Sequence, residues 1–121
     1  MEHCPYQIAI DRMRNLLSIT FASVLWSADV AGRFREECRV AIAALPCQPG
    51  GHVVLVDLRN AVLQPKDVIE KMQAFAASST SRRIALVASS PLARMQTKRL
   101  QVREGIMLFA ELADAEEWLF A

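Results

Sequence analysis

Glycine and histidine are scarce in this sequence of 121 residues, which holds four glycines and two histidines. The loop after the apolar strand that ends at Asp57 has no glycine cradle for a phosphate and no serine, threonine or histidine to accept one. Neither His3 nor His52 has a serine, cysteine or acidic residue at the spacing of a catalytic triad or a metal site. The longest apolar run, from Leu16 to Trp26, is interrupted by hydroxyl side chains and is too short to span a bilayer. Hydrolase, thiol-enzyme and metal-site functions therefore all lack some of their parts.

Neither sign of charge dominates, because 14 basic and 13 acidic residues give a formal net charge of +1. Overall charge therefore does not direct the protein to nucleic acid. The three cysteines lack the spacing of a zinc ribbon or a Cys-x-x-Cys pair, and Cys38 is expected to be a buried structural thiol. The first five residues lack the basic and apolar regions of a signal peptide, so we expect a cytoplasmic protein without a transmembrane segment.

Apolar periodicity predicts that the chain opens with a β-hairpin followed by a helix. Residues 6–10 alternate between apolar and polar, and residues 16–25 continue in a β-favouring pattern after a polar turn at residues 11–15. Ser27 is suitably placed as the N-cap of the helix that follows. The apolar residues of this helix share one face, and they are Val30, Phe34, Cys38, Ala41, Ile42 and Leu45.

Three further strands, each followed by a helix, are predicted after the prolines and glycines that end the first helix. The strands are expected at residues 52–58, 83–88 and 106–109, and the helices at 65–76, 92–102 and 113–119, with Pro65 in the first turn of its helix. The order β-β-α-β-α-β-α-β-α predicts one α/β domain over residues 1–121. It has a mainly parallel sheet, an antiparallel N-terminal hairpin at its edge and helices on both faces.

Three segments carry a resemblance to a known family. They are the strand Val53–Arg59, the strand Arg82–Ser90 that leads to Pro91, and the closing segment Phe109–Leu119. In this order the chain resembles the STAS and SpoIIAA-like proteins over nearly its whole length. The resemblance implies a SpoIIAA-like fold and a non-enzymatic regulatory domain with no cofactor. It also implies that a protein partner binds through the loop after Asp57 and the helix that begins at Pro65.

The start of that helix departs from the pattern of the family. The anti-anti-sigma members open it with Asp-Ser-Ser-Gly, and a partner kinase phosphorylates its serine. The matching residues here read Leu63–Gln64–Pro65–Lys66–Asp67, so the phosphoacceptor is missing. We therefore expect no serine phospho-switch in this segment.

The working surface is predicted at the carboxyl edge of the sheet. Parallel strands present the loops that follow them at one edge, and the amides at the N-termini of two helices point toward it. Ser89 and Ser90 are also suited to capping the helix after them. Asp57 is expected to bind a partner or stabilise its loop, because the further acids and the lysine of a response-regulator receiver are missing. The predicted partner- or ligand-binding residues are Asp57, Arg59, Asn60, Gln64, Lys66, Ser89, Ser90 and Arg94.

Three other features of the sequence lead to further expectations, about a ligand pocket, a basic ridge and self-association. SpoIIAA-like folds resemble the lipid-binding CRAL-TRIO domains in architecture, so the chain could carry a small apolar or lipid-like ligand in a pocket lined by Leu63, Met72, Phe75 and Met95. Residues 82–103 contain no acidic side chain, and Arg94, Lys98, Arg99 and Arg103 give a basic ridge that we expect to be solvated or paired, not bound to nucleic acid. Residues 104–121 contain no basic side chain, and this opposition of charge, with an exposed hairpin edge, predicts a homodimer.

Overall fold

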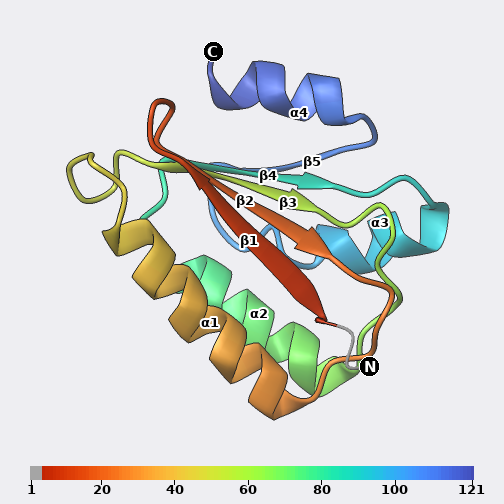
Figure 1. The fold of residues 1–121 in the computed structure, drawn as a ribbon. Coiled ribbons are helices and arrows are strands. Elements are labelled where there is room, and N and C mark those ends of the chain that lie inside the picture. Colours follow the sequence, from red (N-terminus) through yellow and green to blue (C-terminus); the bar gives the residue numbers. More distant parts are fainter. Residues whose placement is uncertain (1–3) are drawn as a thin grey trace.

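The predicted order of strands and helices is confirmed in the computed structural model, which describes residues 4–121 (Figure 1). Residues 1–3, and with them His3, lie outside the described part. The elements are β1 (Tyr6–Asp11), β2 (Leu16–Phe21), α1 (Ala28–Ala43), β3 (Val53–Asp57), α2 (Lys66–Ser78), β4 (Arg83–Val87), α3 (Pro91–Lys98), β5 (Ile106–Phe109) and α4 (Leu112–Leu119).

The strands form one sheet in the order β1-β2-β3-β4-β5. β1 runs antiparallel to β2, and every other neighbouring pair is parallel. The parallel register places Leu17 opposite Val54, Val54 opposite Ile84, and Ile84 opposite Ile106. The carboxyl ends of β2, β3, β4 and β5 therefore lie at the same edge of the sheet, as predicted.

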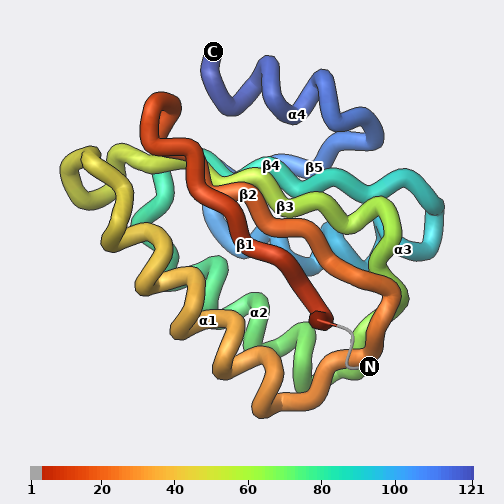
Figure 2. Tube along the Cα trace, viewed as in Figure 1, coloured from red at the N-terminus to blue at the C-terminus, as the bar shows by residue number. Residues whose placement is uncertain are grey.

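Helices cover both faces of the sheet, but unequally. α1 and α2 lie side by side on one face, and α4 lies by itself on the other (Figures 1 and 2). Successive residues of a strand point to opposite faces, so each strand contributes to two apolar clusters. The larger cluster joins side chains such as Leu17 and Val54 to α1 and α2, and the smaller one packs Leu16 and Val53 under Ala115 of α4.

Two elements, β2 and α3, end four residues earlier than their sequence predicts. β2 stops at Phe21 and not at Leu25, because the chain turns after Ala22, where the Val24 amide donates to the Ala22 carbonyl at 2.9 Å. The sequence prediction of α3 up to Val102 is also wrong. The helix ends at Lys98, and a buried Leu100 anchors the turn that follows it.

The starts of the first two helices follow from local sequence. Ser27 is the N-cap of α1, and its hydroxyl oxygen accepts a hydrogen bond from the Val30 amide at 3.2 Å, as predicted. Pro65 is the N-cap of α2 and has extended backbone geometry, so the helix begins at Lys66, one residue later than expected. Its ring fixes φ near −60°, a value that suits both positions.

A buried polar network closes the amino ends of β3 and β4. His52 is 1% exposed, and its Nε2 lies 2.8 Å from the Oγ of Ser81, which lies 2.7 Å from the Oγ of Ser79. Arg103 donates to the carbonyls of Ala76 and Ser81 at 3.1 and 3.0 Å. Burial lowers the pKa of His52, so its ring is neutral at pH 7. Arg103, expected near the basic ridge of the third helix, instead belongs to this network.

Candidate functional site

The loop after β3 is shaped by an ion pair between two of the predicted site residues. The carboxylate of Asp57 accepts hydrogen bonds from Arg59 through its amide at 3.1 Å, its Nε at 2.9 Å and its Nη2 at 2.8 Å. These bonds hold the pKa of Asp57 below its usual value. The Asp57 side chain is 16% exposed and that of Arg59 43%. The carboxylate is therefore occupied within the loop, and the guanidinium is the part of the pair that faces solvent.

Gln64 lies at the same edge but is buried, with 8% of its surface exposed. Its Oε1 accepts from the Trp26 amide at 2.8 Å, and its Nε2 donates to the Val24 carbonyl at 3.0 Å. Its backbone exchanges two further bonds with the amide side chain of Gln96, at 2.8 and 2.9 Å. Gln64 thus ties together the β2–α1 loop, the β3–α2 loop and helix α3.

Asn60 and Lys66 occupy exposed positions on either side of Gln64. The carbonyl of Asn60 accepts a hydrogen bond from the Ser23 hydroxyl, which adds a second link between the two loops. The Nζ of Lys66 lies 3.8 Å from the carboxylate of Glu70, with the lysine side chain 89% exposed. Both side chains are therefore free to meet a partner.

The turn from β4 into α3 places the other three predicted residues beside this loop. Ser90 is the N-cap of α3, and its Oγ accepts from the Ala93 amide at 3.2 Å, so the predicted capping role is confirmed. The hydroxyl of Ser89 reaches the Ala110 carbonyl at 3.4 Å. Arg94 projects from the first turn and is exposed. The structure therefore brings all eight predicted site residues to one edge, with Gln64 below its surface.

Exposed apolar side chains also lie at this edge, where none was predicted to bind a partner, and two of them, Leu63 and Met95, were expected to line a ligand pocket instead. They lie on the three segments that Gln64 joins, and we call them the apolar edge residues: Leu25 (66% exposed), Val62 (37%), Leu63 (47%), Leu92 (66%) and Met95 (69%). Val62 and Leu63 share a small hollow with Ala93 and Gln96 of α3. The sequence did carry a signal for them, because Ala61–Leu63 is an apolar stretch inside a loop.

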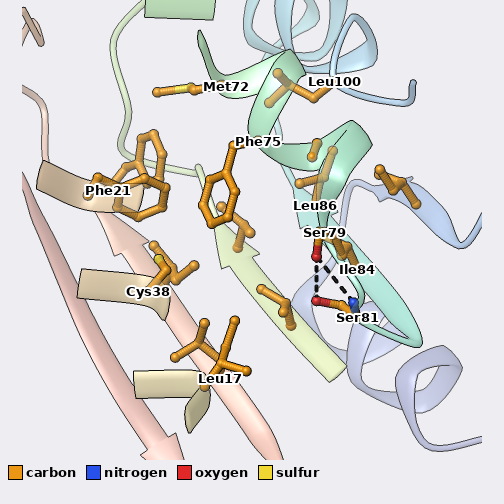
Figure 3. Close-up of a pocket in the computed structure, with 17 residues that line it drawn as sticks. Leu17, Phe21, Cys38, Met72, Phe75, Ser79, Ser81, Ile84, Leu86 and Leu100 are labelled. Atoms are coloured by element: carbon orange, nitrogen blue, oxygen red, sulfur yellow. Dashed lines mark hydrogen bonds between the residues drawn. The ribbon is translucent and has the colours of Figure 1, made fainter. Parts of the chain in front are cut away.

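A separate apolar cavity of about 80 Å³ lies between the sheet and helices α1 and α2 (Figure 3). Phe75 of α2 projects into it, and Met72 and Cys38 contribute to its walls. Burial raises the pKa of Cys38 to about 12, in keeping with the predicted structural thiol. Leu63 and Met95 lie outside this cavity, so the four residues expected to share one pocket are divided between the cavity and the surface.

No trio of histidine, cysteine, aspartate or glutamate side chains in residues 4–121 is grouped so that it could hold a metal ion. Over the same residues, no helix combines the length and the apolar character needed to cross a membrane.

Comparison with solved structures identifies the fold. An uncharacterized protein of the DUF3478 family from Shewanella loihica PV-4, described as having a SpoIIAA-like fold, matches with a TM-score of 0.72 and 16% identity over 98% of each chain. This chain has a SpoIIAA-like fold. The resemblance inferred from the strand and helix motifs is thereby confirmed for the fold.

Two further structures share the SpoIIAA-like fold. An anti-sigma factor antagonist from Mycobacterium paratuberculosis has a TM-score of 0.65 and 13% identity, and covers 94% of this chain and 93% of its own. The anti-sigma factor antagonist SpoIIAA in its unphosphorylated form has a TM-score of 0.60 and 12% identity, with 93% and 95% covered. The sequence matches no family model and no curated protein.

Proposed function

We propose that this SpoIIAA-like chain is a non-enzymatic regulatory module that binds a protein partner at the carboxyl edge of its sheet. The observation that carries the proposal is the exposure of the apolar edge residues on three segments held together by Gln64. Two of the structurally similar proteins are anti-sigma factor antagonists, which supports a regulatory role exerted on another protein.

The composition of this edge suits a protein interface. Exposed leucine and methionine side chains gain free energy when a partner removes them from water, at about 25 cal/mol for each Å² buried. Arg59, Lys66 and Arg94 surround them with positive charge and hydrogen-bond donors, the polar rim that such interfaces usually have. The preferred partner is a protein surface with an apolar centre and acidic or carbonyl groups around it.

Binding at this edge is not switched by phosphorylation of the α2 start. Residues 60–71 contain no serine, threonine, tyrosine or histidine. Incubation with cell extract and ATP is expected to leave this segment unmodified by mass spectrometry. Phosphate mapped to any residue from Asn60 to Lys71 would contradict this part of the proposal.

Site-specific photocrosslinking tests the proposed interface. A photoreactive amino acid at position 63 is expected to capture a protein partner in cells, and the same group at position 13 is not. Met13 is 95% exposed, but it lies in the hairpin turn at the other edge of the sheet (Figure 1). With the photoreactive residue at position 63, the substitutions Leu25→Asp and Leu92→Asp should abolish the crosslink without lowering the melting temperature, because both side chains are exposed. Equal capture from both positions would count against this surface.

The cavity favours a second candidate function, the carriage of a small apolar ligand. An engineered apolar cavity of about 150 Å³ holds benzene, so about 80 Å³ suits a smaller guest unless Phe75 moves. Xenon in the buffer is expected to shift the methyl NMR signals of Met72 and Leu86, and the cavity-filling Ala76→Leu variant should not respond. If the wild-type methyl signals do not shift, the cavity does not accept ligands.

We also propose that the chain acts in the cytoplasm as a homodimer. The proposal rests on the opposed charges of two segments, because residues 82–103 carry only basic side chains and residues 104–121 only acidic ones. Sedimentation at micromolar concentration is expected to show a species of twice the 13.5 kDa chain mass. A single species of 13.5 kDa would contradict the homodimer.

A further inference from the structure

A groove of about 520 Å³ runs along the outer edge of β5, beside helix α3. Met95 of α3 is 69% exposed, and Met107 of β5 is 42% exposed. Leu108 and Gln101 also line the groove. An exposed apolar groove next to the last strand of a sheet is suited to an extended chain that adds to that strand.

The backbone of β5 offers hydrogen-bonding groups to this groove. The carbonyls of Gly105 and Phe109 accept bonds from the amides of Ile84 and Ala88, at 2.7 and 3.0 Å, on the β4 side. The backbone amide and carbonyl groups of successive residues point to alternate sides of a strand. Those of Ile106 and Leu108 therefore point outward, away from β4.

Gln101 shows that a donor can reach the outer edge of β5, because its Nε2 donates to the Ile106 carbonyl at 3.1 Å. This hydrogen bond occupies the carbonyl of Ile106. The outward amide and carbonyl of Leu108 remain open to the groove. The edge therefore retains a donor and an acceptor on one residue, the arrangement that an incoming strand pairs with.

The charge beside the groove is positive. Arg94 and Lys98 lie one turn apart on α3 and line its wall, and both are exposed. Neither forms an ion pair with another residue of the described range 4–121. Residues 82–103 contain no acidic side chain that could neutralise them locally. The wall therefore favours a segment with carboxylates over a neutral or basic one.

We propose that this groove binds an extended acidic segment of a protein partner as a sixth strand, paired with the outer backbone of β5 and held by Arg94 and Lys98. The site shares Arg94 and Met95 of α3 with the carboxyl-edge interface, but its pairing with the backbone of β5 does not depend on that interface. A second copy of the chain fits less well. Antiparallel pairing of two β5 strands would bring both α3 helices, with their like charges, to the same face of the joined sheet.

The probe for this site is an acetylated and amidated Glu-Val-Glu-Val-Glu-Val-Glu peptide, titrated into ¹⁵N-labelled protein. The expected result is a set of amide shifts confined to Ile106–Leu108 and α3, with slowed hydrogen exchange at Leu108. A peptide with lysine in place of glutamate should bind at least about fivefold more weakly. Of two peptides N-methylated at alternate residues, the one that loses the donors facing β5 should not bind.

Charge-reversal variants provide matched controls. Arg94→Glu and Lys98→Glu should each weaken binding of the acidic peptide by about fivefold. Arg99→Glu makes the same change of charge at the C-cap of α3, directly after Lys98 but outside the groove, and should leave the affinity unchanged. All three side chains are exposed, so the variants are expected to fold.

Three results would overturn this assignment. They are equal affinity for the lysine peptide, insensitivity to both N-methylation patterns, and shifts centred on Leu63 and not on β5. Slow hydrogen exchange at Leu108 in the free protein, together with a dimer in sedimentation, would show that a second copy of the chain pairs with β5. That result would also refute the proposal. The photocrosslink at position 63 does not involve β5, so failure of this proposal can be distinguished from failure of the proposed function.

Discussion

At the amino end of the sheet the side chains of His52 and Ser81 are buried and bonded to each other, whereas at the carboxyl end Leu25 and Leu63 are exposed. Burying a polar group is unfavourable unless it finds a hydrogen-bond partner, and exposing an apolar group forfeits the free energy of its burial. At the amino end, His52 and Ser81 find their hydrogen-bond partners within the chain. The carboxyl end leaves its apolar groups exposed, and this difference is the reason for proposing it as the binding end of the sheet.

The carboxyl end also has one buried polar anchor, Gln64. It is the one predicted site residue that is buried there, and its bonds to Val24, Trp26 and Gln96 fix the loops that carry the exposed leucines. A surface that is ordered before it binds has less conformational entropy to lose on binding. The comparison between the two ends can therefore be tested by disturbing one polar anchor at each.

Gln64→Ala should have the largest effect on stability. The truncation leaves the buried Trp26 amide and the part-buried Val24 carbonyl without partners, and we expect the free energy of unfolding to fall by about 2 to 4 kcal/mol. Urea denaturation measures this loss. Gln7→Ala is the control, because Gln7 is exposed on β1 and should change stability by less than about 0.5 kcal/mol. A Gln64 variant as stable as the control would show that the three segments do not depend on this anchor.

Acidification should destabilise the protein through the amino end. Burial lowers the pKa of His52 in the folded state. Below pH 6.5, the ordinary pKa of histidine, the unfolded state therefore binds a proton at His52 more readily than the folded state does. Stability is therefore fully present above pH 6.5 and is lost as the pH falls toward the lowered pKa, by at most about 1.4 kcal/mol per pH unit. Urea denaturation between pH 7.5 and 5 gives this slope, and His52→Gln should flatten it. An equal slope in the variant would place the titrating group elsewhere.

Arg59→Ala should shift the pKa of Asp57 but change the free energy of unfolding only slightly. Asp57 loses its hydrogen-bonding partner, so the pKa of its carboxyl should rise toward the usual value. The free energy of unfolding should fall by less than about 1 kcal/mol, because the guanidinium is partly exposed. An NMR titration of the Asp57 carboxyl follows the first change and urea denaturation the second. A pKa that does not move would mean that another group holds the carboxylate in its charged form.

Lys66→Ala should have the smallest effect. Its ammonium group lies 3.8 Å from Glu70 with both side chains largely exposed, and such pairs contribute at most about 0.5 kcal/mol. Thermal denaturation should therefore not distinguish the variant from the wild type. A marked loss of stability would make Lys66 a structural residue and remove it from the proposed rim.

Much of this architecture followed from local patterns. The alternation in β1, the helical spacing after Ser27 and the hydroxyl before Pro91 are each complete within a few residues, so sequence was sufficient to predict the elements that they define. The common direction of the parallel strands then placed residues as far apart as Asp57 and Ser90 at one edge. These predictions needed no knowledge of distant contacts.

The features that sequence missed depend on partners far along the chain. Gln64 reads as an exposed loop amide until Gln96, 32 residues later, is seen to bond its backbone. His52 had no visible role because its partner Ser81 lies at the start of another strand. Leu63 was expected to line a pocket, and only the tertiary arrangement shows that 47% of its surface stays exposed.

The order of the strands in the sheet repeats their order along the chain. Each strand after the hairpin therefore docks against the one synthesised just before it, and every crossover closes a loop between neighbours. Such a sheet can grow by successive addition from the hairpin, without first bringing together remote parts of the chain, which lowers the entropic barrier to folding. β5 joins last and pairs with a single strand, β4, so we expect it to open first in local unfolding. Hydrogen exchange should accordingly be fastest for β5 among the parallel strands.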